Sequence, residues 1–436
     1  MESNAFSAYQ MDLADEEEQE DMDWDLTTAA MAAIVAGVLI ARQRRVERRH
    51  ERRLYLTRPQ LLPDPRSDTP WQVLYASRND RAFITTMGFD TQSFEDILEA
   101  GFYGTWTTTP IPRGDTAATG NPRPGARSLD AAGALGLALH FLNSTMREIS
   151  LQQIFALIPS TVSRYIHFSL DILLAVLRQI PDARIQWPSG IEEFQSYNNL
   201  IVTRHPLLTG AFASIDGLNL PVQTANDPEI ENATYNGWLC EHFVSSVLVF
   251  SPEGTIIAAK INAPGSWHDS RVARTIYEKL RTQTPDGFYL VADTAFPRGA
   301  NQIEGRIRAP IKTGQTLRGT ASEIQEKLAF DRQLLSYRQT AEWGMRGLQG
   351  AFGRLRLPLE IDNAERRANL LETCIRLHNF RARRVGHNQI REVYMPLWRQ
   401  TTEDEQVWDG FEKMLFSDQR RKDRVARFHN FAVFNS

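Results

Sequence analysis

The sequence predicts an α/β fold, a mixed sheet flanked by helices, preceded by an all-α region that contains a helix-turn-helix. Four short, apolar, β-rich runs predict strands, at 211–217, 243–250, 255–261 and 288–293. Helical patterns follow the third and fourth runs, at 269–281, 321–356 and 363–384. Three meandering strands, a helix, a fourth strand and then long helices are typical of one sheet covered by helices.

The bulk composition indicates a mostly globular chain. Its 436 residues suggest two or three domains, and 42% hydrophobic with 23% charged residues are enough to build a large core. The two cysteines, Cys240 and Cys374, exclude a disulfide framework or a zinc knuckle and predict a reducing compartment. The net charge of −4 argues weakly against a nucleic-acid binder, but it hides a strong asymmetry along the chain.

That asymmetry lies at the N-terminus. Nine of the fourteen residues at 12–25 are acidic, which predicts a disordered or solvated tail. The apolar run at 29–41 is shorter than the roughly 20 residues that span a bilayer. We therefore expect a buried Ala-rich helix and no stable membrane association, with a short membrane anchor as the alternative. Seven arginines at 42–53 fit a nuclear address, a phosphate-contacting patch or a solvated helix face.

These patterns divide the chain into five expected segments. They are an acidic tail with an apolar helix and an Arg-rich stretch (1–56), a Pro-rich connector (57–127), a helix-turn-helix domain (128–200), an α/β domain (201–390) and a C-terminal tail (391–436).

Within the helical domain, residues 150–155 fit a short helix, and a turn follows. A second helix begins at Thr161, with Ser160 as its expected N-cap. In a recognition helix, Ser160, Thr161, Ser163 and Arg164 would meet phosphates or base edges at its N-terminal end. From the pattern alone, a plain helical bundle that packs on the core explains the segment equally well.

Two aspartates end apolar strands of the expected sheet. Asp216 closes the first strand and Asp293 the fourth, at the position where ligands of an α/β sheet gather. A carboxylate at the end of a buried strand is costly unless it meets a cation or a donor. Magnesium takes such oxygen ligands, and two ions of this kind are common in phosphodiester cleavage.

A third acid is needed from a neighbouring element, and Glu342 is the candidate. Arg338 and Arg346 lie four residues before and after it, so the three share one helix face. Each acid has an ordinary alternative: a strand-end aspartate often caps a helix, and this helix face fits a surface ion-pair stripe. The order and spacing of the three acids favour a shared metal site: Asp293 follows Asp216 by 77 residues, and Glu342 follows Asp293 by 49.

The motifs around these acids carry a family resemblance. Residues 211–385 resemble the PIF/Harbinger class of DDE transposases and the nucleases derived from them. The matching stretches are 214–217, 263–270 (APGSWHDS), 290–297 (LVADTAFP), 309–310, the helix 338–357 and the closing Leu377-His378-Asn379. Around Trp343 the helix departs from the commoner Lys-rich form of the family.

The resemblance implies a ribonuclease-H-like fold with Asp216, Asp293 and Glu342 as catalytic carboxylates that bind two Mg²⁺ or Mn²⁺ ions. It implies metal-dependent cleavage of DNA, with strand transfer in an active transposase, and it places a helix-turn-helix where this chain has its candidate. A Myb-like DNA-binding partner, a homo-oligomer and the nucleus follow as expectations. The alternative is a domesticated, catalytically silent DNA-binding protein that keeps the fold.

Three further assignments concern the surroundings of the acids. Asp269 is either a metal ligand or, as the residues themselves favour, the N-cap of the following helix, with His268 lining the site. Arg338, Arg346 and the arginines within 381–384 are expected to neutralise DNA phosphates.

Overall fold

The computed structural model describes residues 28–45, 60–61, 64–112, 120–237, 239–296, 303, 305–312, 315, 317–386 and 388–395. The expected acidic tail, the Arg-rich stretch beyond residue 45 and the C-terminal tail beyond residue 395 lie outside these residues. The chain divides into two units, Met1–Gln60 and Leu61–Ser436, and each is described by itself.

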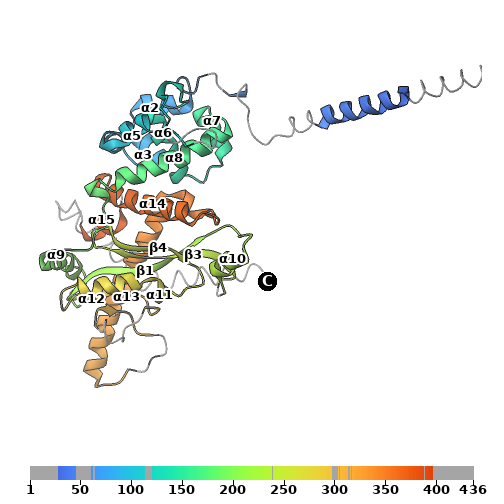
Figure 1. Ribbon diagram of the computed structural model, residues 1–436. Helices are drawn as coiled ribbons and strands as arrows, with labels where there is room; N and C mark the ends of the chain where they lie inside the picture. The colour runs from blue at the N-terminus through green and yellow to red at the C-terminus, as the bar shows by residue number, and fades with distance from the viewer. Residues whose placement is uncertain are drawn as a thin grey trace, which may run out of the picture. The chain divides into compact units, whose positions relative to one another are not determined.

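The first unit contains one described helix, residues 28–45 (Figure 1, blue). It is a helix as expected, but all its described side chains are exposed, and Met31 and Ile34 are each 63% exposed. Within this unit nothing described covers the helix, and the expectation of a buried helix stays a prediction.

The second unit begins with helices where a connector was expected. The elements are α2 (Pro70–Ser77), α3 (Asp80–Met87), α4 (Thr91–Ile97), η2 (Leu98–Phe102) and α5 (Tyr103–Thr108). Their aromatic side chains Trp71, Phe83, Phe94 and Trp106 are fully buried. The expected extended connector over 57–127 is thus wrong for 70–108. Pro70 misled the prediction, because it lies in the first turn of α2, where a missing backbone N–H costs nothing.

The remaining helices of this region are α6 (Ala131–Asn143), α7 (Glu148–Phe155) and α8 (Pro159–Leu177). In the described part of the chain, α8 is the one helix long and apolar enough to cross a membrane, and 56% of that apolar window is buried inside the protein. The apolar side of α8 packs in the core, and a soluble protein's core helix meets the same criterion.

The two expected helices of the helix-turn-helix are α7 and α8, joined by three residues. Ala156 ends α7 in the left-handed conformation, with φ of 51°. The N-cap of α8 is Ile158, without a side-chain hydrogen bond, so the expectation of Ser160 as N-cap is wrong. The helix begins earlier because the fixed φ of Pro159 suits the first helical position.

The sheet contains the four predicted strands as β1 (Ala211–Pro221), β3 (Glu241–Phe250), β4 (Ile256–Pro264) and β5 (Tyr289–Val291). Two short strands, β2 (Tyr235–Asn236) and β6 (Ile307–Arg308), add to them. β1 pairs antiparallel with β3 and parallel with β5, β3 pairs antiparallel with β4 and β2, and β5 pairs parallel with β6. The sheet is therefore mixed, as predicted.

Helices cover both faces of this sheet (Figure 1). One face packs against α13 (Ala321–Ala351) and α14 (Ala364–Arg384), and the other against α9 (Ile191–Val202), α11 (Asp269–Val272) and α12 (Arg274–Thr282). Alternation along β3 divides its side chains between the two cores: Leu248 and Phe250 face the first, Val247 and Val249 the second. The shorter elements are η3 (Pro124–Ala126), η4 (Pro181–Ala183), α10 (Pro228–Thr234), η5 (Gly353–Arg356) and α15 (Gln389–Tyr394).

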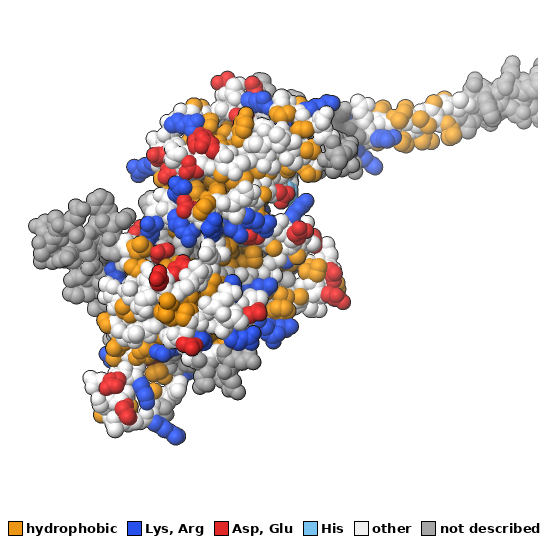
Figure 2. All heavy atoms as spheres, turned by 60° about the vertical axis from the view of Figure 1, so that its left-hand side comes forward, with side chains coloured by type: hydrophobic (Ala, Val, Ile, Leu, Met, Phe, Trp, Pro, Cys, Tyr) orange, Lys and Arg blue, Asp and Glu red, His pale blue; other side chains and the backbone are white. Residues whose placement is uncertain are grey.

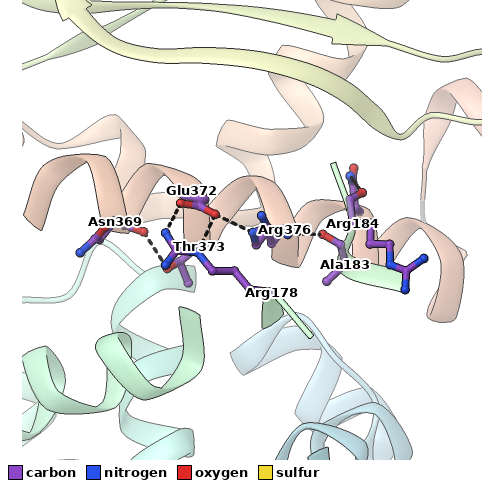
Figure 3. A network of polar contacts seen from close by, with 8 residues as sticks. Arg178, Ala183, Arg184, Asn369, Glu372, Thr373 and Arg376 are labelled. Carbon is purple, nitrogen blue, oxygen red and sulfur yellow. Dashed lines mark hydrogen bonds and ion pairs between the residues drawn. The ribbon is translucent and has the colours of Figure 1, made fainter. Parts of the chain in front are cut away.

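A polar network joins the helical region to α14 (Figure 3). Glu372 on α14 accepts hydrogen bonds of 3.0 and 2.6 Å from Arg178 and one of 2.8 Å from Arg376. Asn379 donates to the carbonyl of Arg184 at 2.7 Å and to that of Ile256 on β4 at 2.8 Å. α14 therefore contacts both the helical region and the sheet.

Candidate active site

The strand register places the two aspartates close to each other. In the parallel pair of β1 and β5, Ser214 lies opposite Val291. Asp216 and Asp293 each come two residues later, so they lie at neighbouring positions on adjacent chain segments. Asp293 follows the end of β5, whereas Asp216 lies within β1, which continues to Pro221, so the expectation that Asp216 closes its strand is wrong. The two carboxylates also interact electrostatically, because the negative charge of Asp293 raises the pKa of Asp216.

Asp216 is the most deeply placed of the acids. The pKa of its carboxyl is raised to about 6, chiefly by burial, and the charges of Asp293 and Asp269 act in the same direction. The backbone N–H of Gly217, which donates to Oδ1 at 2.8 Å, and the guanidinium of Arg338 act in the opposite direction. A carboxylate in this position is stabilised by additional positive charge.

Asp269 lies over the strand that carries Asp216. A Cβ added to Gly217 would meet Oδ2 of Asp269 at 2.5 Å, so the carboxylate occupies the space that a side chain would fill. Burial raises the pKa of Asp269, while the ring of His268 lowers it. The expectation that Asp269 caps the helix is wrong: His268 is the N-cap of α11, and its Nδ1 accepts from the backbone of Ser270 at 3.3 Å. Asp269 is the first helical residue and turns toward β1, and His268 is exposed beside it.

Glu342 reaches the site from α13. A buried hydrogen bond of 2.7 Å joins Thr340, two residues earlier, to Ser214 on β1. Arg338 Nη2 lies 3.0 Å from Glu342 Oε1, and Nη1 of the same guanidinium lies 3.6 Å from Asp293 Oδ2. Arg346 Nη2 lies 3.9 Å from the other oxygen of Glu342. The stripe expected on this helix is therefore present, and Arg338 also reaches across to the sheet.

Arg338 is consequently the cation around which the acids are arranged. It contacts Asp293 and Glu342 directly and lowers the pKa of Asp216. Within the described residues, no group of three or more His, Cys, Asp or Glu side chains is close enough to hold a metal ion together. The donor set suits a hard cation, because it consists of carboxylate oxygens, one of them buried. Glu342 is instead paired with Arg338 and Arg346.

The residues expected to contact DNA are divided between different surroundings. Ser160 is exposed on α8, and Thr161, Ser163 and Arg164 are half-buried. Ser163 lines a cavity of about 300 Å³ together with residues of α14 and η5. This position places Ser163 toward the sheet domain, so its expected role in DNA recognition has no direct support.

The arginines at 381–384 also differ among themselves. Arg383 donates to the carbonyl of Asp182 at 2.6 Å, and Arg384 donates to the Asp182 carboxylate at 2.6 Å. Both therefore hold η4 against α14, and their expected contact with DNA phosphates stays a prediction. Arg381 has a different environment, because it lines a pocket together with Arg346 and His378.

Two residues that position the candidate acids were not predicted from the sequence. Ser214 and Thr340 lie in apolar surroundings and gave no signal except that each is a small polar residue two positions before an acid. The 263–270 motif also has a structural element that the sequence did not reveal: Arg271 stacks on the ring of Trp267, at 3.9 Å from its centroid. That stacking supports the turn that leads into α11.

The mixed sheet, the helices on both its faces and the neighbouring acids define an α/β domain with a cluster of carboxylates. Residues 215–379 match the family of DDE superfamily endonucleases. The matched segment is less than half of the chain and contains Asp216, Asp269, Asp293 and Glu342. No curated protein and no solved structure matches the chain.

Proposed function

We propose that this protein is a divalent-metal-dependent DNA endonuclease of the PIF/Harbinger type, with Asp216, Asp293 and Glu342 as its catalytic carboxylates. The observation that carries the proposal is the arrangement of these acids around Arg338 inside the segment that matches DDE superfamily endonucleases. Two-metal phosphodiester cleavage uses clustered carboxylates of this type, because they hold the metal ions that bind the oxygens of the reacting phosphate.

The strand order supports a ribonuclease-H-like assignment of the domain. An antiparallel meander of β1, β3 and β4 continues on the other side of β1 into parallel β5 and β6. In this arrangement β1 is central, and acids from β1 and the end of β5 face a helix acid. These three acids, Asp216, Asp293 and Glu342, form the candidate triad.

Asp216, Asp293 and Asp269 would hold Mg²⁺ or Mn²⁺, joined by Glu342. Such ions, two of which are expected, stabilise the attacking and leaving oxygens of a phosphodiester. Arg338 neutralises Asp293 and Glu342 in the metal-free protein, so it keeps the acids together before an ion arrives. When a phosphate enters, the same guanidinium is placed to donate to it.

A nicking assay on supercoiled plasmid tests this function. The wild type should nick DNA with Mg²⁺ or Mn²⁺ and not with EDTA. Asp293→Asn and Glu342→Gln should each abolish nicking, whereas Glu278→Gln, an exposed acid on α12, should leave it unchanged. Metal-dependent nicking that survives Asp293→Asn would sink the proposal.

A silent DNA-binding protein is the second candidate, and the ion pairs of Glu342 favour it. Arg338 and Arg346 balance this carboxylate without any metal. Lys and Arg side chains also gather in a band across the middle of the face shown in Figure 2, which suits a polyanion. DNA binding that needs no divalent ion, in a protein that never nicks, would establish this alternative.

The cellular setting of this function is a proposal as well. The Arg-rich run at 42–53 supports a nuclear location. A Myb-like DNA-binding partner and self-association fit the proposed class. A tagged protein that remains outside the nucleus would contradict the location, and light scattering together with co-purification tests the partners.

A further inference from the structure

A small pocket lies beside the acids, on the other side of Arg346. Its volume is about 220 Å³, and α13 and α14 form its walls, with Asn388 and Gln389 at one end. Arg346 lines the pocket and also lies 3.9 Å from Glu342. The pocket is therefore adjacent to the candidate active site and shares one residue with its ion pairs.

The charges that line this pocket have one sign. Arg346 and Arg381 are its ionised residues, and the described lining contains no aspartate or glutamate. His378 is buried, and burial lowers its pKa to about 4, so its ring is neutral at physiological pH. The ring donates from Nε2 to the carbonyl of Gly254 at 3.2 Å.

Arg381 is the unusual member of the pocket. Burial lowers the pKa of its guanidinium, and no acid offsets that effect. Its Nε atom is buried without a hydrogen-bond partner among the described residues. Arg383 and Arg384, by contrast, are both satisfied by Asp182. A half-buried arginine with an unmet donor is stabilised when an anion enters its pocket.

Asn388, another polar residue of the pocket lining, is already engaged. Asn388 donates to the carbonyl of Gly254 at 2.8 Å and accepts from the backbone N–H of Ile390 at 3.0 Å. Gly347 leaves the space open, since a Cβ there would meet the ring of His378 only at 3.8 Å. Among the described lining residues, Arg381 thus carries the buried donor without a partner, and Arg346 adds a second positive charge.

We propose that this pocket binds a backbone phosphate of DNA, next to the phosphate that lies at the acids. A guanidinium donates to two oxygens of a phosphodiester at once, and the pocket has room for one such group. The inference rests on the proposed function for the identity of the substrate. Through Arg346, the bound phosphate would set the position of the strand relative to Glu342.

The salt dependence of DNA binding tests the pocket. Affinity is measured by fluorescence anisotropy with a double-stranded oligonucleotide in EDTA, between 50 and 200 mM salt. Loss of one phosphate contact lowers the slope of log K against log salt by about 0.9 and the affinity by about tenfold at 0.1 M salt. Arg381→Gln should show both changes. Arg81→Gln, an exposed arginine on α3, carries the same charge change and should show neither.

A second variant separates binding from folding. Gly347→Leu fills the pocket at an exposed helix position without any change in charge, and leucine favours a helix more than glycine does. It should keep the melting temperature and still lower the salt slope. Slopes equal to the wild type in both Arg381→Gln and Gly347→Leu would overturn the proposal.

Free phosphate is the other source of this chemistry. If inorganic phosphate raises the melting temperature of the wild type but not of Arg381→Gln, while the DNA slope is the same for both, the pocket is a free-anion site and the DNA assignment is wrong. Because binding is measured in EDTA, its outcome is independent of cleavage. A protein that nicks nothing can still show the slope change, and one that nicks can lack it.

Discussion

Thr340 and Ser214 form a buried hydrogen bond of 2.7 Å between their hydroxyl oxygens, and each residue stands two positions before a candidate catalytic acid. The bond joins the middle of α13 to the central strand of the sheet. It fixes the position of α13 along β1, and therefore the position of Glu342 relative to Asp216.

Thr340→Val should destabilise the protein, because it leaves the Ser214 hydroxyl buried without this partner. The expected loss is about 1–3 kcal/mol in the free energy of unfolding, measured by denaturant titration. The double variant Ser214→Ala/Thr340→Val should lose less than the two single variants together. Strict additivity would show that the two hydroxyls do not depend on each other.

Binding of Mn²⁺ should weaken as the pH falls below about 6. Asp216 has a raised pKa of about 6 in the folded, metal-free protein, so below that pH a proton occupies the carboxylate that the ion requires. Calorimetry in buffers of different ionisation enthalpy should detect about one proton released per binding event at pH 5 and almost none at pH 8. Equal proton release at both pH values would contradict the assignment of Asp216.

Mild acid should destabilise the fold through buried histidines. Burial lowers the pKa of His140, His205 and His378 to about 4 each, below the value of 6.5 in an unfolded chain. The unfolded state therefore binds more protons between pH 6.5 and 4, and stability falls as the pH falls through that window. The loss is on the order of 3 kcal/mol per histidine when the window is crossed completely.

Melting temperatures at pH 7.5, 5.5 and 4.5 measure this effect. His140→Phe removes one titrating group from a site where the ring already packs edge-on against Trp71 and Phe155. Its melting temperature should fall less between pH 7.5 and 4.5 than that of the wild type. An identical fall would show that His140 is not protonated on unfolding in this range.

Glu372→Gln should loosen the helical region from the sheet. The hydrogen bonds from Arg178, with those from Arg376, hold the pKa of Glu372 below its usual value, so this contribution is present at neutral pH and is lost as the pH falls through the lowered pKa. We expect a loss of about 1–3 kcal/mol at pH 7 and faster proteolysis near α14. Glu365→Gln, an exposed acid on the same helix, is the matched control and should melt like the wild type.

The sequence was sufficient for the four longer strands and for the order of the acids, because apolar β-rich runs and the aspartates that follow their apolar residues are local signals, although β1 continues beyond Asp216 to Pro221. It was not sufficient for α2 to α5, where prolines suggested an extended chain although Pro70 begins a helix. The strands β2 and β6 are two residues each and carry no periodicity. The helix spacing predicted the pairing of Arg338 with Glu342, but its contact with Asp293 depends on the packing of α13 against the sheet.

The position of Asp269 directly above Gly217 has a practical consequence for mutational scans. A single methyl group at residue 217 would push the carboxylate out of its place, although residue 217 itself can neither ligate an ion nor transfer a proton. Loss-of-function screens would score Gly217→Ala as if it removed a ligand. The double variant Gly217→Ala/Asp269→Ala would expose the difference. Its loss of activity would be smaller than the combined losses of the two single variants, because both changes act through the same carboxylate.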